Sequence, residues 1–380
     1  SGFGGDDGDG GTSAVVVVPP PPPRYDVDLG TLEHISYAAC RAKAPQVALK
    51  AWDCSSPLTG NGTGGGSEGL YESAVASFFK NFAEKQDDLG FAALADMEGR
   101  GGYRPSRALI REVAQEISGA VPRLDNAYYI LVNGTEGTSI TTASLNCLVC
   151  GAALLGDVDR AFGAFEEFGR RDDVEHDGDT LIFLMECLAN CADRMVTGRG
   201  GRRWVRGRGE RSVGDDADAG AGAESEGWDG EHEIPEDVTA ELIEAAVGVL
   251  EMVDELEKRS WDRDRRRRPP PDAAAAAVRR RTAHHYVRLL SLAGETEEAR
   301  RTLEATASSE EGALPDTFLS VAFGYAHRGD FRRAMEVVTD LPRRTGHGAL
   351  PKYVTNRIEY LRRDRERLRR RGETRTKTAT

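Results

Sequence analysis

The sequence predicts an all-α protein: a right-handed superhelical solenoid of helix-turn-helix repeats. A phrase with a glycine, an alanine five residues later and apolar residues at helical spacing occurs three times, at 155–168, 292–306 and 327–341. A second helical pattern precedes each glycine, so each unit reads as helix, glycine turn, helix. Because one hairpin cannot bury its apolar face alone, the recurrence predicts that successive hairpins stack on one another.

The first helix of each unit carries four apolar or small residues at steps of +3, +1 and +3, which places them on one helical face. Gly294 and Gly329 give the period, 35 residues (329 − 294). An eighth first helix has Val354, Ile358 and Leu361 but Arg357 in one apolar position. The other seven tetrads begin at Leu32, Val75, Ile110, Leu145, Leu181, Ala283 and Phe318.

Second helices show a small residue followed four residues later by a large apolar one. The small residue permits close approach of the helices, and the large one is expected to fill the space between units. The pairs are Ala48 and Trp52, Ala127 and Leu131, Ala161 and Phe165, Ala299 and Leu303, and Ala334 and Val338.

Composition shifts divide the chain further. Segments rich in glycine, proline and charge are expected to be disordered or to act as linkers. The insertion at 197–236 replaces a turn between two helices, so the hairpin around it is expected to stay intact. The predicted segments are a disordered Gly/Pro-rich leader (1–28), helical repeats (29–196), a disordered Arg-Gly then acidic insertion (197–236), a helix completing the interrupted repeat (237–258), a linker (259–278), helical repeats (279–371) and a tail (372–380).

Charge and apolar content exclude several classes. A net charge of −13 argues against a general polyanion binder, although 352–377 has eleven Lys or Arg against four Asp or Glu. No apolar run approaches the roughly 18 residues of a membrane span, so no membrane partner is expected. No phosphate-loop, serine-hydrolase or metalloprotease motif is present, which predicts neither catalytic residues nor a cofactor. We expect that the protein is not an enzyme.

Six cysteines in 380 residues do not form a disulfide scaffold. Cys147 and Cys150, with Cys187 and Cys191, have spacings that could supply four thiolates to zinc. Both pairs lie in apolar, helix-like segments, which favours buried thiols and no metal site.

The units at 142–177 and 280–344 resemble the pentatricopeptide-repeat family, whose repeats are about 35 residues long. "LGDVDRAFGAFEEF" and "TFLSVAFGYAHRGDFRRAMEVVTDLP" carry the resemblance. The tetratricopeptide family is the nearest alternative, but its Trp, Gly and Tyr pattern is absent. The resemblance implies an RNA-binding adaptor in a mitochondrion or chloroplast, acting in RNA processing, stability or translation.

In the resembled family, one base is read by a residue early in the first helix together with the last residue of the unit. Asn146 and Asp177 occupy these two positions and resemble the family's uracil-reading pair; the alternative is a solvated Asn and a loop Asp. His284 holds the early position in a later unit. The remaining early positions do not support a base-by-base code along the groove; they are Glu33, Ala76, Arg111, Ile182, Leu319 and Thr355.

An arginine-glycine-rich stretch opens the insertion. It resembles RNA-binding segments in which guanidinium groups contact phosphates and stack on bases. The alternative is a solvated loop. Its candidate residues are Arg199, Arg202, Arg203, Trp204, Arg206 and Arg208.

Two functions are therefore expected. The first is binding of single-stranded RNA in organellar RNA metabolism or translation. The second is a protein-interaction scaffold, such as a structural subunit of an organellar ribosome, whose groove holds a protein or an RNA backbone without reading bases.

Overall fold

The computed structural model describes residues 29–44, 47–48, 50–51, 68–81, 87–99, 104–133, 140–197, 234–264, 273–309 and 312–378. Within these ranges every regular element is a helix. The first helices of the hairpins are α1 (Leu29–Arg41), α3 (Glu68–Asn81), α5 (Arg107–Ile117), α7 (Thr142–Leu155), α9 (Gly178–Thr197), α12 (Ala273–Leu292), α14 (Pro315–His327) and α16 (Lys352–Thr378). The second helices are α4 (Asp87–Gly99), α6 (Val121–Val132), α8 (Val158–Gly169), α11 (Glu236–Asp264), α13 (Thr296–Ala307) and α15 (Phe331–Arg344).

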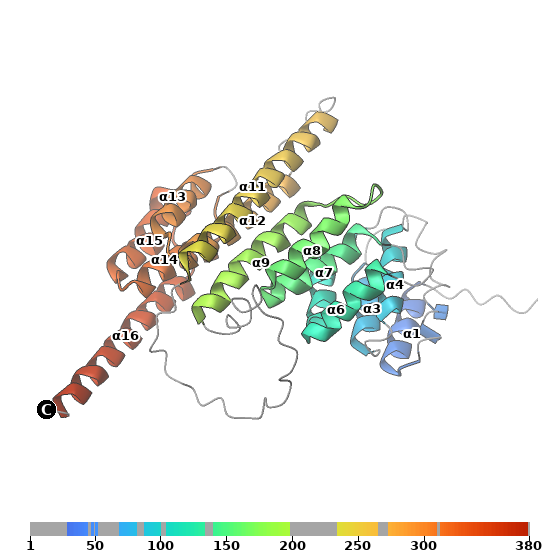
Figure 1. Ribbon diagram of the computed structural model, residues 1–380, viewed down its shortest axis with the longest axis horizontal. Coiled ribbons are helices and arrows are strands. Elements are labelled where there is room, and N and C mark those ends of the chain that lie inside the picture. Colours follow the sequence, from blue (N-terminus) through green and yellow to red (C-terminus); the bar gives the residue numbers. More distant parts are fainter. Residues whose placement is uncertain are drawn as a thin grey trace, which may run out of the picture.

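The first helices form a continuous stack. Each contacts the next along the chain, from α1 to α3 and onward to α16, and from α3 to α14 each packs against the second helix of its own hairpin. Figure 1 shows the hairpins following one another along the longest axis of the molecule. Each predicted tetrad begins inside a first helix. The helical-repeat solenoid predicted from the sequence is confirmed.

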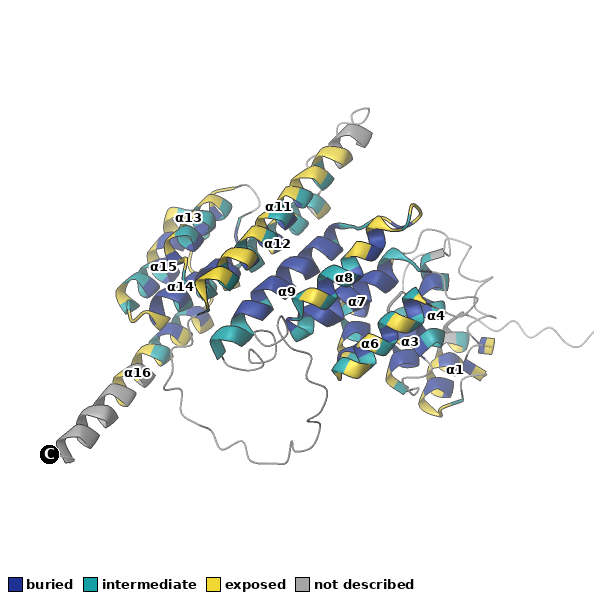
Figure 2. Cartoon of the chain, in the orientation of Figure 1, coloured by how far each residue is buried: buried dark blue, intermediate teal, exposed yellow. Residues whose placement is uncertain are grey.

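Burial follows the predicted apolar face. In α14 the whole tetrad is buried, from Phe318 to Tyr325, and in α16 Val354 and Ile358 are fully buried. The central first helices are covered on all sides: every residue of α7 from Ala143 to Ala153 is buried, as Figure 2 shows by its colour. This follows because α4, α5, α6, α8 and α9 all contact α7.

The glycine turns depend on backbone conformation. Gly156 has φ +57 at the end of α7, and a Cβ there would lie 3.0 Å from the backbone of Asn190 and of Cys191 on α9. Gly294 and Gly329 are also left-handed, with φ +90 and +83. Because only glycine adopts this conformation without strain, the turn that revealed the repeat is fixed by backbone geometry.

The long insertion lies inside a hairpin. α9 ends at Thr197 and α11 begins at Glu236, yet α11 contacts both α9 and α12, and α9 contacts α12 directly. The stack is therefore continuous across the insertion. The predicted disordered leader (1–28) and residues 198–233 of the predicted insertion (197–236) lie outside the described residues.

Two predicted boundaries differ from the structure. The expected linker (259–278) is helical at both ends, because α11 continues to Asp264 and α12 begins at Ala273. Alanine has the highest helix propensity of any residue type. The five alanines from Ala273 therefore form a helix, although the charge of this segment predicted a linker. The expected tail (372–380) is helical as far as Thr378, since one glycine in a run rich in arginine costs a helix only about 1 kcal/mol.

No helix within the described ranges has the length and apolar composition required to cross a bilayer.

Candidate nucleic-acid interface

Asp177 organises the start of α9. Its Oδ1 accepts the backbone N–H groups of Asp179 and Thr180 at 2.9 and 3.0 Å. Thr180 Oγ1 accepts the N–H of Asp177 in return, at 3.1 Å. This reciprocal capping satisfies donors that a helix N-terminus otherwise leaves without partners. The carboxylate is thereby fixed in position.

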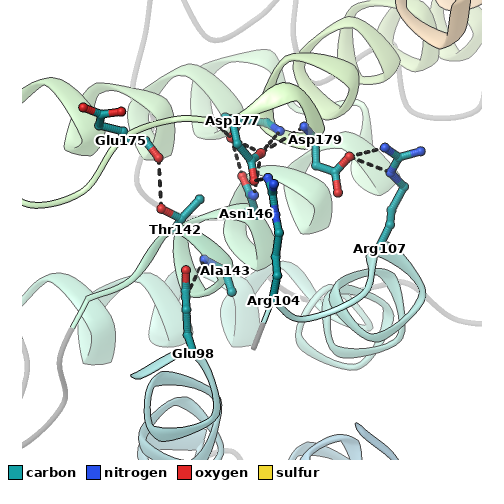
Figure 3. Close-up of polar contacts among 10 residues, drawn as sticks. Glu98, Arg104, Arg107, Thr142, Ala143, Asn146, Glu175, Asp177 and Asp179 are labelled. Atoms are coloured by element: carbon teal, nitrogen blue, oxygen red, sulfur yellow. Dashed lines mark hydrogen bonds and ion pairs between the residues drawn. The ribbon is translucent and has the colours of Figure 1, made fainter. Parts of the chain in front are cut away.

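Asn146 on α7 meets this carboxylate, as the sequence positions anticipated. Its Nδ2 donates to Asp177 Oδ1 at 3.2 Å, and its Oδ1 accepts from Thr180 Oγ1 at 2.6 Å. Figure 3 shows the amide and the carboxylate facing each other between α7 and the start of α9. Asn146 is fully buried. Both ends of its amide are therefore bonded inside the protein, and a base reaches the amide only if this network opens.

Arginines from the start of α5 bind carboxylates of α9. Arg104 forms an ion pair with Asp177, and its side chain is 68% exposed. Arg107 Nε donates to Asp179 Oδ1 at 2.9 Å. One turn further along α5, Arg111 Nη1 donates to Glu186 Oε2 at 3.1 Å. The Arg107 and Arg111 pairs join α5 to α9, two units apart, and the Arg104 pair joins the segments just before these helices. Figure 3 shows the Arg104 and Arg107 pairs.

The N-terminus of α7 is held in the same region. The N–H of Ala143 donates to Glu98 Oε2 of α4 at 3.2 Å, and Thr142 Oγ1 donates to the carbonyl of Glu175 at 2.9 Å. All of these partners lie around one end of the first helices. The N-terminus of α7 is therefore fixed both to α4 and to the segment before α9.

The pKa of Asp177 reflects these contacts. Burial alone raises it, but the Thr180 N–H, the Arg104 charge and the Asn146 amide outweigh burial and hold the pKa below its usual value. The carboxylate is ionised at neutral pH, so it can orient the amide.

His284 repeats the arrangement of Asn146 in a later unit. Its Nδ1 lies 2.9 Å from Thr317 Oγ1, and Thr317 occupies the same register in α14 that Thr180 occupies in α9. Burial lowers the pKa of His284. In both units, therefore, the early residue of one first helix bonds a hydroxyl near the start of the next.

His285 lies beside His284 on α12, with ring centroids 5.0 Å apart. Its Nδ1 is buried and has no hydrogen-bond partner among the described residues. Burial, His284 and the arginines Arg288, Arg111 and Arg107 lower its pKa to about 3. His285 is therefore neutral at physiological pH.

The other candidate residues divide into two groups. The arginine-glycine stretch lies outside the described residues, so the structure does not place Arg199, Arg202, Arg203, Trp204, Arg206 or Arg208. The cysteines at 147, 150, 187 and 191 are buried free thiols, and burial raises the pKa of all four. No group of three or more potential metal ligands lies together in the described part of the chain.

Sequence reasoning missed Thr180 and Thr317, and also the arginines that bind carboxylates. A signal was present, because each threonine lies two residues before the early reading position of its own helix, Ile182 or Leu319. A second recurring signal joins successive second helices: Arg123 binds Asp87 at 2.8 Å, Arg160 binds Asp125 at 2.7 Å, and Arg333 binds Glu297. These pairs are 35 or 36 residues apart.

No protein-family model and no curated protein matches the sequence. Among solved structures, the chain is similar to the pentatricopeptide repeat protein PPR10 from maize, with a TM-score of 0.21 and 12% sequence identity. The match covers 93% of this chain and 64% of that one, so this chain spans less than two thirds of its length.

Proposed function

We propose that this protein is a pentatricopeptide-repeat-like adaptor that binds single-stranded RNA in a mitochondrion or chloroplast, without a catalytic step. The observation that carries the proposal is the contact between Asn146 and Asp177, 31 residues apart and at the two positions that the family resemblance assigns to base reading. An amide offers a donor and an acceptor to a base edge, and an ionised carboxylate orients it. The proposal extends to RNA processing, stability or translation.

RNA has to compete with protein groups at this site. The Asn146 amide is exposed only when its bonds to Asp177 and Thr180 break, whereas the Arg104 side chain is already 68% exposed. We therefore expect Arg104 to exchange Asp177 for a phosphate, which releases one side of the carboxylate. Binding that requires such an exchange is slower than binding to an open groove.

The internal pairing favours a second candidate, a protein-interaction scaffold such as a subunit of an organellar ribosome. α7 is buried from Ala143 to Ala153, and Arg107 and Arg111 already bind carboxylates. A region whose arginines already bind carboxylates of the same chain suits a rigid spacer better than a reader of bases.

Fluorescence anisotropy with labelled 15-nucleotide single-stranded RNAs distinguishes the RNA-binding function from the protein-interaction scaffold. The RNA function predicts saturable binding whose affinity falls steeply between 50 and 200 mM salt, because each neutralised phosphate releases counterions. Absence of binding at low salt would remove the RNA function and leave the scaffold. Crosslinking and sequencing of bound RNA then identifies the target, and imaging of the tagged natural protein tests the organelle.

A further inference from the structure

Helix α16 presents an uncovered face that alternates tyrosine and arginine. Its opposite face packs on α14 and α15 through Val354, Ile358 and the partly buried Leu361. On the uncovered face Tyr353 is 53% exposed and Tyr360 is 56% exposed, although tyrosine rings of this size normally contribute to buried surfaces. The helix extends away from the rest of the stack (Figure 1).

The face is continuous along the helix. At about 100° per residue, Tyr353, Arg357, Tyr360 and Arg367 lie within about 80° of one another. The two rings are separated by about 10 Å along the axis. Glu359 and Glu366 lie about 100° and 120° away from Tyr360, whereas Asp364 falls in the same angular range as the four residues, so the face includes one acidic position.

Its side chains are arranged for stacking. The Cζ of Arg357 lies 5.7 Å from the centre of the Tyr360 ring, a cation–π contact in which Tyr360 remains 56% exposed. Tyr353 donates from its hydroxyl to Asp316 at 2.8 Å, which fixes the ring while leaving it exposed. Both rings are thus held in place and accessible.

The position of α16 in the stack explains why the face is uncovered. Arg357 occupies the register of Val321 in α14, where the side chain is fully buried. Among the described elements no helix follows α16, so an apolar residue at that register would be exposed to water. A terminal repeat needs a polar outer face, and this requirement alone accounts for Arg357. It does not account for two exposed aromatic rings on the same face.

We infer that the Tyr353, Arg357, Tyr360 and Arg367 face of α16 binds single-stranded RNA, with bases stacked on the tyrosines and phosphates held by the arginines. This inference rests on the proposed RNA function and names a site separate from the Asn146 pair. Charge complementarity selects the partner: 352–377 carries eleven Lys or Arg against four Asp or Glu in a chain of net charge −13. A protein partner that buries a helix face needs an apolar centre, and among the described side chains of α16 the exposed large apolar ones are the two tyrosines.

The test uses the whole chain and anisotropy with a labelled 15-nucleotide RNA of mixed sequence. Tyr360→Ala is expected to weaken binding at least about fivefold, and Tyr353→Ala/Tyr360→Ala further, while Tyr360→Phe retains binding because the ring remains. Arg357→Gln/Arg367→Gln is expected to flatten the plot of log affinity against log salt by about 1.4, or 0.7 per lost phosphate contact. Matched controls are Tyr129→Ala on α6, where the residue is 65% exposed, and Arg301→Gln, whose side chain is 72% exposed.

The outcomes distinguish this inference from the proposed function. If the wild type binds RNA and the α16 variants bind as tightly as the controls, the α16 site is wrong and the RNA function stands. If the wild type binds no RNA at low salt, the proposed function fails and this site fails with it. If the arginine variant loses RNA and polyglutamate equally while the tyrosine variants lose neither, the face binds acidic chains without stacking, and the inference is overturned.

Discussion

Arg107, the first residue of α5, donates from Nε to Asp179 at the start of α9, 72 residues later in the chain. The two residues belong to hairpins that are two units apart, with α7 between them. In most repeat proteins each unit contacts only its neighbours, so stability propagates from one unit to the next. Here the α5 to α9 ion pairs couple next-nearest units, which fixes the relative orientation of three consecutive hairpins.

Breaking one of these pairs is expected to destabilise the stack. The Glu186 side chain is only 8% exposed, so Arg111→Met leaves a nearly buried carboxylate without its partner and should cost roughly 1–3 kcal/mol. Arg111→Met/Glu186→Leu should recover much of this loss, because removing both charges removes the desolvation penalty too. Urea unfolding of both variants checks this. Equal losses in the single and the double variant would contradict it.

Replacing Asn146 tests both its contribution to stability and its proposed role in reading an RNA base. Asn146→Ala removes a partner from Asp177 and from Thr180 and should cost roughly 1–3 kcal/mol of unfolding free energy. Thr180→Val is the matched control, since it opens the same network but keeps the amide. If Asn146 reads a base, its replacement should additionally weaken binding to uridine-rich RNA by about 1–3 kcal/mol, with little change for other sequences. Equal RNA affinities of the two folded variants would exclude base reading by Asn146.

The buried ring of His285 is expected to make the unfolding free energy fall in acid. The pKa of His285 is lowered to about 3 in the folded chain from 6.5, so the folded state resists binding a proton that the unfolded state accepts. Its contribution is complete above pH 6.5 and is lost as pH falls below that value, at roughly 1.4 kcal/mol per unit toward pH 3. The lowered pKa of Asp177 acts only below about 3.8. Between pH 6.5 and 4.5, the change of unfolding free energy with pH therefore reports on the titration of the buried histidines.

Unfolding free energies across that interval check the assignment. His285→Leu should flatten the slope, because it removes the buried ring with the lowered pKa. An unchanged slope in His285→Leu would show that the buried ring is not the group that titrates.

Phe168 and Phe165 on α8 should differ in their contributions. Phe168 is 5% exposed, and Phe168→Ala should cost about 3–5 kcal/mol. Phe165 is only half-buried and contacts the rings of Phe168 and His176, at centroid distances of 6.0 and 5.5 Å, so Phe165→Ala should cost clearly less. Limited proteolysis and thermal melts of both variants measure the difference. A larger loss at Phe165 would reverse the assignment.

The insertion should be dispensable for folding. Replacing residues 198–233 by a short Gly-Ser linker leaves α9, α11 and α12 and their mutual contacts intact. The total helical circular dichroism signal should stay nearly unchanged, and unfolding should stay cooperative. A large additional loss of helicity would contradict the continuous stack.

The repeat was predictable because its signal is local. Two local features recur in the sequence: helical periodicity, and a glycine at the turn, where the backbone needs a left-handed conformation. Gly156, Gly294 and Gly329 indeed have positive φ. The buried small residues of the second helices were also correct: Ala48, Ala127, Ala161, Ala299 and Ala334 are fully buried. Leu131, Leu303 and Val338 are buried as expected.

Phe165 packs against the buried core as expected, but it is only partly buried. On α8 the buried face includes Ala161, Ala164 and Phe168. This face is rotated about the helix axis relative to the expected face through Ala161 and Phe165. Which of two phenylalanines three residues apart is buried more deeply depends on the angle between hairpins, and the sequence of one helix does not determine that angle.

The candidate site was predictable only in part. The positions of Asn146 and Asp177 followed from the repeat register, and the two residues do meet. Their burial and the partnership with Thr180 and Arg104 depend on how tightly consecutive units wind, which the sequence of one unit does not determine. RNA reading by Asn146, Asp177 and His284 stays a prediction.

α11 completes its hairpin by packing on α9 and α12, so the helices on the two sides of residues 198–233 contact each other directly. Cutting the chain within 198–233 would leave one fragment ending with α9 and a second beginning with α11. The surfaces by which α9 contacts α11 and α12 would then be divided between two molecules. The two fragments, produced separately, should reassemble as a split protein, so that one protease site engineered into this segment would convert a single solenoid into a switchable heterodimer.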